Sequence, residues 1–188
     1  MTKTESKSKN IKNTKTYSLV LVALFTALTA VFSQIFIPIG PVPINLALLA
    51  VFISGGLLGI ARSTTSQLVF LLLGAVGVPV FAGFKGGFGS LIGPTGGYII
   101  GYVLAVLAIS LILSKTGKKI PFIVLSLVVG LIICYAFGTA WFVYSTNTAF
   151  IDALFLCVIP FLIGDAVKIA LATFLIYRLK KFVWLIKT

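Results

Sequence analysis

The last apolar stretch of this 188-residue chain contains one acid and one base, Asp165 and Lys168, in a segment that begins at Pro160 and reads Pro-Phe-Leu-Ile-Gly-Asp-Ala-Val-Lys. Residues three positions apart share a helix face, so both charges can point into one cavity. A charge at mid-bilayer depth costs roughly 2.5 to 3.5 kcal/mol, so such groups usually face a polar interior or a ligand. We interpret the pair as a ligand site. The simpler alternative is a structural ion pair that fixes helix packing.

Other reactive side chains are scarce. The chain has no histidine, three acidic residues and two cysteines. The serines therefore have no histidine partner for nucleophilic catalysis, and Asp152 and Asp165 are thirteen positions apart. Cys134 and Cys157 lie in apolar runs and are interpreted as packing residues. We expect no catalytic residue, no metal site and no cofactor, and the chain contains no Walker motif that would bind a nucleotide phosphate.

Composition places the charge pair in a membrane protein. Hydrophobic residues make up 60% of the chain, charged residues make up 10%, and the mean hydropathy is +1.19. A soluble domain of this length could not bury so much apolar surface, whereas membrane helices need not hide it from water. The first apolar run is interpreted as a retained helix and not as a signal peptide, because the rest of the chain is equally hydrophobic.

The apolar segments predict an all-α membrane protein with six transmembrane helices. Residues 1–16 are polar and are expected to form a mobile cytosolic tail, which leaves residues 17–188 as a single six-helix transmembrane domain. The last helix either starts near residue 149 and bends at Pro160 or starts with Pro160 in its first turn, and in both cases ends near residue 179. The five preceding helices are expected at residues 17–36, 45–61, 63–76, 93–113 and 121–144.

Three connectors between these helices have unusual compositions. Residues 37–45 are rich in proline, which predicts a stiff connector because proline fixes its backbone angle and lacks an amide hydrogen. Residues 78–97 are apolar and rich in glycine, and residues 141–148 begin with aromatic side chains. Irregular backbone is tolerated at membrane depth only against protein or a wet cavity, so we place the glycine-rich loop over a cavity. The alternative is an interfacial loop whose phenylalanines rest on lipid.

The basic residues indicate an orientation. The basic residues that give the net charge of +12 lie at the ends of apolar segments, and no segment is long enough to form a soluble module that would bind nucleic acid. With both termini in the cytosol, every basic residue except Lys85 and Lys168 falls on the inner side, as the positive-inside rule requires. The three connectors then lie outside, and the cavity opens to the exterior.

A small-residue face on the first helix suggests a partner. Ala23 and Ala27 are one turn apart, and small residues at this spacing let another helix approach closely. The chain itself has no nucleotide-binding domain and no relay of acids or histidines that would power transport. Together with the expected outward pocket, these features favour a ligand-capturing subunit that depends on another protein for energy.

The chain resembles the BioY family, the biotin-specific S components of energy-coupling factor (ECF) vitamin transporters. The motifs that carry this resemblance are residues 41–45 (Pro-Val-Pro-Ile-Asn), 55–59 (Gly-Gly-Leu-Leu-Gly), 74–81 (Gly-Ala-Val-Gly-Val-Pro-Val-Phe), 93–98 (Gly-Pro-Thr-Gly-Gly-Tyr) and 160–168. The resemblance implies a six-helix S-component fold in the plasma membrane of a bacterium, capture of biotin from outside, and assembly with a transmembrane T component and two ATPase subunits. It also implies that Ala23 and Ala27 contact the T component, and that the S component tips over in the membrane to deliver its vitamin.

Biotin suits the charge pair chemically, since it has a ureido ring, an apolar ring and a carboxylate tail. As a hypothesis, Asp165 accepts hydrogen bonds from the ureido N–H groups, and Lys168 donates to the ureido oxygen or the carboxylate. Further contacts are expected from the polar side chains of Asn45 and Tyr98 and from the cover formed by Phe84, Gly86 and Trp141. Four alternatives remain: an S component for a different small vitamin, a stand-alone membrane facilitator, a channel, and a membrane enzyme.

Overall fold

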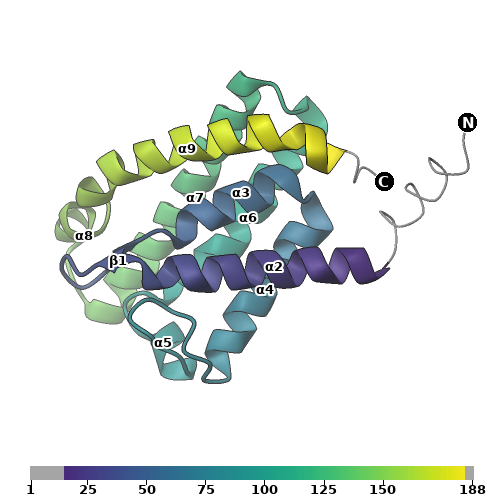
Figure 1. The fold of residues 1–188 in the computed structure, drawn as a ribbon. Helices are drawn as coiled ribbons and strands as arrows, with labels where there is room; N and C mark the ends of the chain where they lie inside the picture. Colours follow the sequence, from purple (N-terminus) through teal and green to yellow (C-terminus); the bar gives the residue numbers. More distant parts are fainter. Residues whose placement is uncertain (1–14, 185–188) are drawn as a thin grey trace, which may run out of the picture.

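The computed structural model describes residues 15–184, and helices account for most of them (Figure 1). The elements in chain order are α2 (Lys15–Gln34), β1 (Phe36–Ile37), β2 (Ile44–Asn45), α3 (Ala47–Leu57), α4 (Ile60–Ala75), α5 (Phe88–Ile92), α6 (Gly96–Thr116), α7 (Ile120–Thr146), α8 (Phe150–Cys157) and α9 (Ile159–Trp184). Most of the expected tail, residues 1–14, lies outside the described residues. Its last two residues belong to α2.

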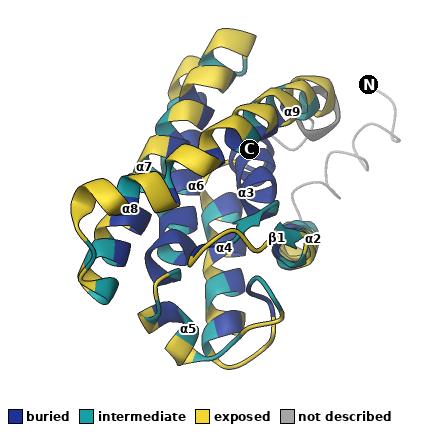
Figure 2. Ribbon diagram, turned by 90° about the vertical axis from the view of Figure 1, so that its left-hand side faces the viewer, coloured by how far each residue is buried: buried dark blue, intermediate teal, exposed yellow. Residues whose placement is uncertain are grey.

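Within residues 15–184, four helices are long and apolar enough to cross a membrane: α2, α6, α7 and α9. Their number and composition indicate a multi-pass membrane protein. By contrast, α3 has only 11 residues, or roughly 17 Å at 1.5 Å per residue. Every residue of α3 is buried, and Figure 2 shows this helix enclosed by elements whose outer faces are exposed. The short helix therefore forms the centre of the bundle.

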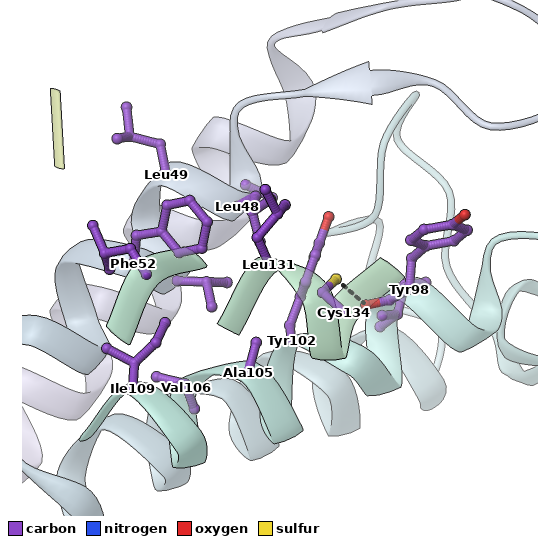
Figure 3. Packing of buried hydrophobic residues seen from close by; sticks show 14 of the residues in the cluster. Leu48, Leu49, Phe52, Tyr98, Tyr102, Ala105, Val106, Ile109, Leu131 and Cys134 are labelled. Carbon is purple, nitrogen blue, oxygen red and sulfur yellow. Dashed lines mark hydrogen bonds between the residues drawn. The ribbon is translucent and has the colours of Figure 1, made fainter. Parts of the chain in front are cut away.

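The core forms where α3 meets α6 on one side and α9 on the other. Phe52 of α3 lies near Val106 and Ile109 of α6, all of them buried (Figure 3). A side chain at Gly56 would collide with Ile176 of α9, so only glycine permits this close approach of the two helices. Packing around α3 thus fixes α9, the helix that carries the charge pair, against the middle of the bundle.

The proline-rich connector is more regular than its composition predicts. It forms a small antiparallel hairpin in which Phe36 pairs with Asn45 and Ile37 pairs with Ile44. The ladder tolerates the prolines because Pro38 follows β1 and Pro43 precedes β2, so neither interrupts the paired residues. The next helices also differ in their bounds: α3 ends at Leu57 and not near residue 61, and α4 begins at Ile60 and not at residue 63. The five-residue helix α5 was not expected.

The last apolar region consists of two helices. The first, α8, ends at Cys157; Val158 leaves the helical conformation with φ −123° and ψ −56°, and α9 starts at Ile159. This agrees with the alternative that puts Pro160 in the first turn and not with a single bent helix. Proline inside a continuous helix would lose one hydrogen bond and clash with the carbonyl four residues earlier. The break places Asp165 less than two turns from the start of α9.

The irregular segments gather at one end of the bundle. In Figure 1 the hairpin, α5 and α8 lie at the same end, while α2 begins and α9 ends at the opposite end. Residues of the hairpin and α5 line one cavity together with residues of α3, α6, α7 and α9. The fold thus brings the proline-rich hairpin and the glycine-rich loop to the same opening.

Candidate functional site

A cavity opens between the hairpin, the loop before α5 and the first turns of α6 and α9. The cavity measures about 100 Å³, or about 820 Å³ with the open solvent at its mouth included. Its wall is mostly apolar, with Leu48, Phe70, Phe81 and Phe161 among the contributors. A mostly apolar cleft with a few converging polar groups is the usual form of a small-molecule site.

The charge pair forms part of this wall. Lys168 Nζ lies 2.7 Å from Asp165 Oδ1, and the two residues are 5% and 1% exposed. The Tyr135 hydroxyl of α7 donates a hydrogen bond to Asp165 Oδ2. As their spacing predicts, the two charges lie on one helix face and border one cavity.

Both members of the pair keep hydrogen-bonding capacity. A lysine ammonium has three N–H donors, and a carboxylate has about four acceptor positions. Within residues 15–184, Lys168 donates to Asp165 alone, and Asp165 accepts only from Lys168 and Tyr135. Buried polar groups normally find partners, so the remaining donors and acceptors suit a polar ligand that enters the cavity.

Asn45 and the two tyrosines of α6 extend the polar part of the wall. Tyr102 donates to Asn45 Oδ1 at 3.4 Å, and the same oxygen accepts the Ala47 amide at 3.1 Å at the start of α3. The Tyr98 hydroxyl lies 3.1 Å from Thr139 Oγ1 of α7. Figure 3 shows Tyr98 and Tyr102 one turn apart on the same helix. These groups both line the cavity and tie its walls together.

Three of the expected contacts lie outside the cavity wall. Phe84 is 72% exposed at the tip of its loop, where it adopts a positive φ of 56°. Gly86 lies against the backbone carbonyls of residues 77 and 78, so it serves close chain packing. Trp141 turns toward the loop before α6 and donates from Nε1 to the Gly93 carbonyl at 3.0 Å. The structure therefore brings together Asn45, Tyr98, Asp165 and Lys168, but not these three.

The alanines of the first helix lie away from the cavity. Ala23 and Ala27 are exposed on α2, whereas Phe25, Thr26 and Thr29 of the same helix are buried. Their face is thus accessible in the structure. For metal binding, the described residues contain no group of three side chains of the types that ligate metals.

Comparison with known proteins identifies the family. The model of the BioY family matches residues 3–184. The chain belongs to the BioY family. Among curated proteins, the "Probable biotin transporter BioY" of Pyrococcus horikoshii is 41% identical over 85% of this chain and 94% of its own. The "Biotin transporter BioY" of Thermotoga maritima is 40% identical over 87% and 95%. The resemblance inferred from the motifs is therefore confirmed.

A solved structure shows the same fold. The crystal structure of "the S-component for biotin from an ECF-type ABC transporter" matches with a TM-score of 0.81 at 31% identity, and the match covers 96% of this chain and 95% of the other. This similarity extends over nearly the whole length of both chains. The helical S-component fold predicted from the BioY motifs is thus present here.

Three residues that line the cavity were not predicted from the sequence. Tyr135 lies within an apolar run, Lys85 is an isolated cation in a glycine-rich loop, and Tyr102 follows Tyr98 by one turn. All three line the cavity. The spacing of Tyr98 and Tyr102 was a usable signal, because residues four apart share a helix face. No local signal reveals that Tyr135 faces Asp165, because that contact depends on how α7 packs against α9.

Proposed function

We propose that this chain is the substrate-binding (S) subunit of an ECF-type transporter, which captures biotin from outside the cell and delivers it through an ATP-driven complex. The observation that carries the proposal is the buried pair of Asp165 and Lys168 with unused hydrogen-bonding capacity in the wall of a cavity. The names of the relatives, as biotin transporters and as an S component for biotin, support this ligand.

The charge pair matches the ureido ring of biotin. This ring has two N–H donors and one carbonyl oxygen, so Asp165 can accept from an N–H group while Lys168 donates to the oxygen. Hydrogen bonds to charged groups contribute roughly 1.5 to 3 kcal/mol each, more than neutral ones. In the structure each charge has a partner, so the ligand would add bonds without breaking the pair.

The rest of biotin would extend from the charge pair toward the mouth of the cavity. Its apolar ring would contact Phe81 and Phe161, and Asn45 and Tyr98 would complete the polar contacts. Lys85, on the loop before α5, is the second cation in the cavity wall and is suited to the carboxylate tail. Phe84, Gly86 and Trp141 would then belong to the outer cover and not to the binding wall.

We infer a topology with six membrane crossings and both termini in the cytosol of a bacterial cell. The domain of residues 17–188 would lie in the plasma membrane, with residues 1–16 as a cytosolic tail. The clustering of basic residues supports this orientation, as does the arrangement in which α2 begins and α9 ends at the end of the bundle away from the cavity. The cavity would then open to the exterior.

Calorimetry of purified protein with biotin tests the proposal. Asp165→Asn and Lys168→Ala should each weaken binding by about ten- to a hundredfold, because each removes a hydrogen bond to a charged group. Asp152→Asn and Lys119→Ala are matched controls, since both side chains are exposed, and they should bind as the wild type does. Unchanged affinity in the first two variants would refute the assignment, and titration with other vitamins would identify a different ligand.

The proposed partners are a transmembrane T component and two ATPase subunits. The exposed small-residue face of α2 at Ala23 and Ala27 supports an approaching helix there. Ala23→Trp or Ala27→Trp should leave biotin binding intact and abolish uptake in cells, because a large side chain blocks close helix packing. If the tryptophan variants copurify with the T component in normal yield, this face is not the contact.

A further inference from the structure

The side chain of Gln34 spans the loop that borders the mouth of the cavity. Gln34 is the last residue of α2, and its Nε2 donates to the carbonyls of Val80 and Phe81, both at 3.1 Å. Its Oε1 accepts the backbone amide of Phe84 at 2.9 Å. One side-chain amide therefore bonds to both arms of the turn, much as a neighbouring strand would.

The preceding residue strengthens the same connection. The Ser33 hydroxyl donates to the Val80 carbonyl, so two consecutive residues of α2 hold the loop. Their positions differ in one important respect: Ser33 lines the cavity, whereas Gln34 does not. A change at Gln34 can therefore affect the loop without removing a side chain from the cavity wall.

Among the described residues, the tip of the loop has few other contacts, one of which is the Phe36 ring near Gly83. At its base, the Phe81 ring packs against Phe70 with ring centroids 5.5 Å apart, and Phe81 and Lys85 pair across the turn. At the tip, Gly83 and Phe84 both adopt positive φ, and Phe84 is largely exposed. A positive φ is unfavourable for phenylalanine, so the turn needs external hydrogen bonds to keep this shape. Gln34 supplies them.

We propose that Gln34 is a positioning residue that latches residues 79–85 over the mouth of the cavity and thereby sets how fast the ligand enters and leaves. The inference rests on the proposed function in that the ligand used to measure it is biotin. The loop contributes Phe81, Ala82 and Lys85 to the cavity wall, so its release opens the route to the charge pair.

The contacts explain why glutamine occupies this position. The latch needs two donors for Val80 and Phe81 and one acceptor for the Phe84 amide, and only a carboxamide of this length offers both. Glutamate has the same length but no N–H donors when it is ionised. Gln34→Glu therefore tests the donors alone, while Gln34→Ala removes the whole latch.

Biotin kinetics separate a latch from a direct contact. We expect Gln34→Ala to release bound radiolabelled biotin into an excess of unlabelled biotin about tenfold faster than the wild type, as for the net loss of one or two hydrogen bonds. The association rate should rise as well, so the affinity changes less than the release rate. A variant that loses a ligand contact changes mainly the release rate. Gln34→Glu should behave like Gln34→Ala, and Val31→Ala, one turn earlier on the exposed face, should match the wild type.

A second measurement needs no ligand. Trypsin cleaves after lysine in mobile backbone, and Lys85 is an exposed lysine within the latched loop. Cleavage after Lys85 should be faster in Gln34→Ala, while cleavage after Lys119, in the connection between α6 and α7, should not change. Equal acceleration at both lysines, or wild-type behaviour in both assays, would overturn the latch. A wild-type protein that binds no biotin would instead refute the proposed function, and the trypsin assay would still test the latch.

Discussion

Two of the buried polar clusters within residues 15–184 differ in whether they border the cavity. The charged cluster consists of Tyr135, Asp165 and Lys168, on α7 and α9. The neutral cluster consists of Thr29, Ser54 and Gln67, on α2, α3 and α4. Asp165 and all three members of the neutral cluster are almost completely buried. Depth of burial therefore does not distinguish a ligand site from a packing site.

The two clusters differ in charge and in what their hydrogen bonds leave free. In the neutral cluster, the hydroxyls of Thr29 and Ser54 each donate to a carbonyl of their own helix at 2.8 Å. Gln67 Nε2 then donates to Thr29 at 3.2 Å, and none of the three residues lines the cavity. This arrangement joins three helices, and the oxygen that it leaves unpaired among the described residues, Gln67 Oε1, belongs to a residue outside the cavity wall. The charged cluster keeps donors and acceptors in a cavity wall, which is what a ligand site requires.

The largest expected effect is a loss of stability in single variants of the charged cluster, and it can be measured separately from biotin binding. Asp165→Leu or Lys168→Met alone should lower the free energy of unfolding by about 3 to 5 kcal/mol, because each leaves a buried charge unpaired. The double variant Asp165→Leu/Lys168→Met should recover most of that loss, since apolar residues of similar size can replace a buried ion pair. Stability is measured by denaturant titration, and biotin binding by calorimetry.

The double variant should recover stability but not biotin binding. If the pair serves a ligand, the double variant folds but binds no biotin; if the pair serves only helix packing, the double variant both folds and binds. The second result would remove the distinction between the two clusters. It would also support the simpler alternative of a structural ion pair.

The charge pair could be predicted from the sequence because its signal is local. Two opposite charges three positions apart in an apolar run specify both a helix face and a buried partner. Phe84 and Trp141 were expected to cover the ligand because they are aromatic residues in the connectors, yet composition does not determine the direction in which a side chain points. Phe84 is exposed at a position with a positive φ, and Trp141 donates to the Gly93 carbonyl. Directions of this kind depend on tertiary packing.

The dependence on tertiary packing also limits how much of the fold could be predicted from the sequence. Long apolar runs predicted the helices within a few residues, and proline placed the start of α9. The hairpin at residues 36–45 was missed because its strands have two residues each, too few for an alternating pattern. In the sequence, Gln34 follows Ser33 at the end of the first apolar run, and Gln67 follows four hydroxyl residues at positions 63–66. Their roles follow from partners more than thirty positions away.

An intermediate loss of unfolding free energy is expected from Tyr135→Phe. This variant removes the hydroxyl that donates to Asp165 Oδ2 while it keeps the ring. The ligand-free protein should lose about 1.5 to 3 kcal/mol of unfolding free energy, the usual contribution of a hydrogen bond to a charged group. Tyr177→Phe, whose side chain is half-exposed on α9, is a control for the loss of a hydroxyl and should change stability little. Equal stability of Tyr135→Phe and the wild type would show that the tyrosine does not support the charge.

The smallest change in stability is expected from Gln67→Leu in the neutral cluster. Within the described part of the chain, Gln67 Oε1 accepts no hydrogen bond, so Gln67→Leu removes an unpaired buried oxygen as well as a weakly bonded donor. Thr29 and Ser54 keep the bonds that they donate. The free energy of unfolding should therefore change by less than about 1 kcal/mol, and biotin binding should not change. Gln67→Glu should be clearly less stable than Gln67→Leu in denaturant titration, because it places an acid among residues that offer no cation to balance it. If Gln67→Leu instead lost biotin binding, the neutral cluster would be coupled to the cavity and not confined to helix packing.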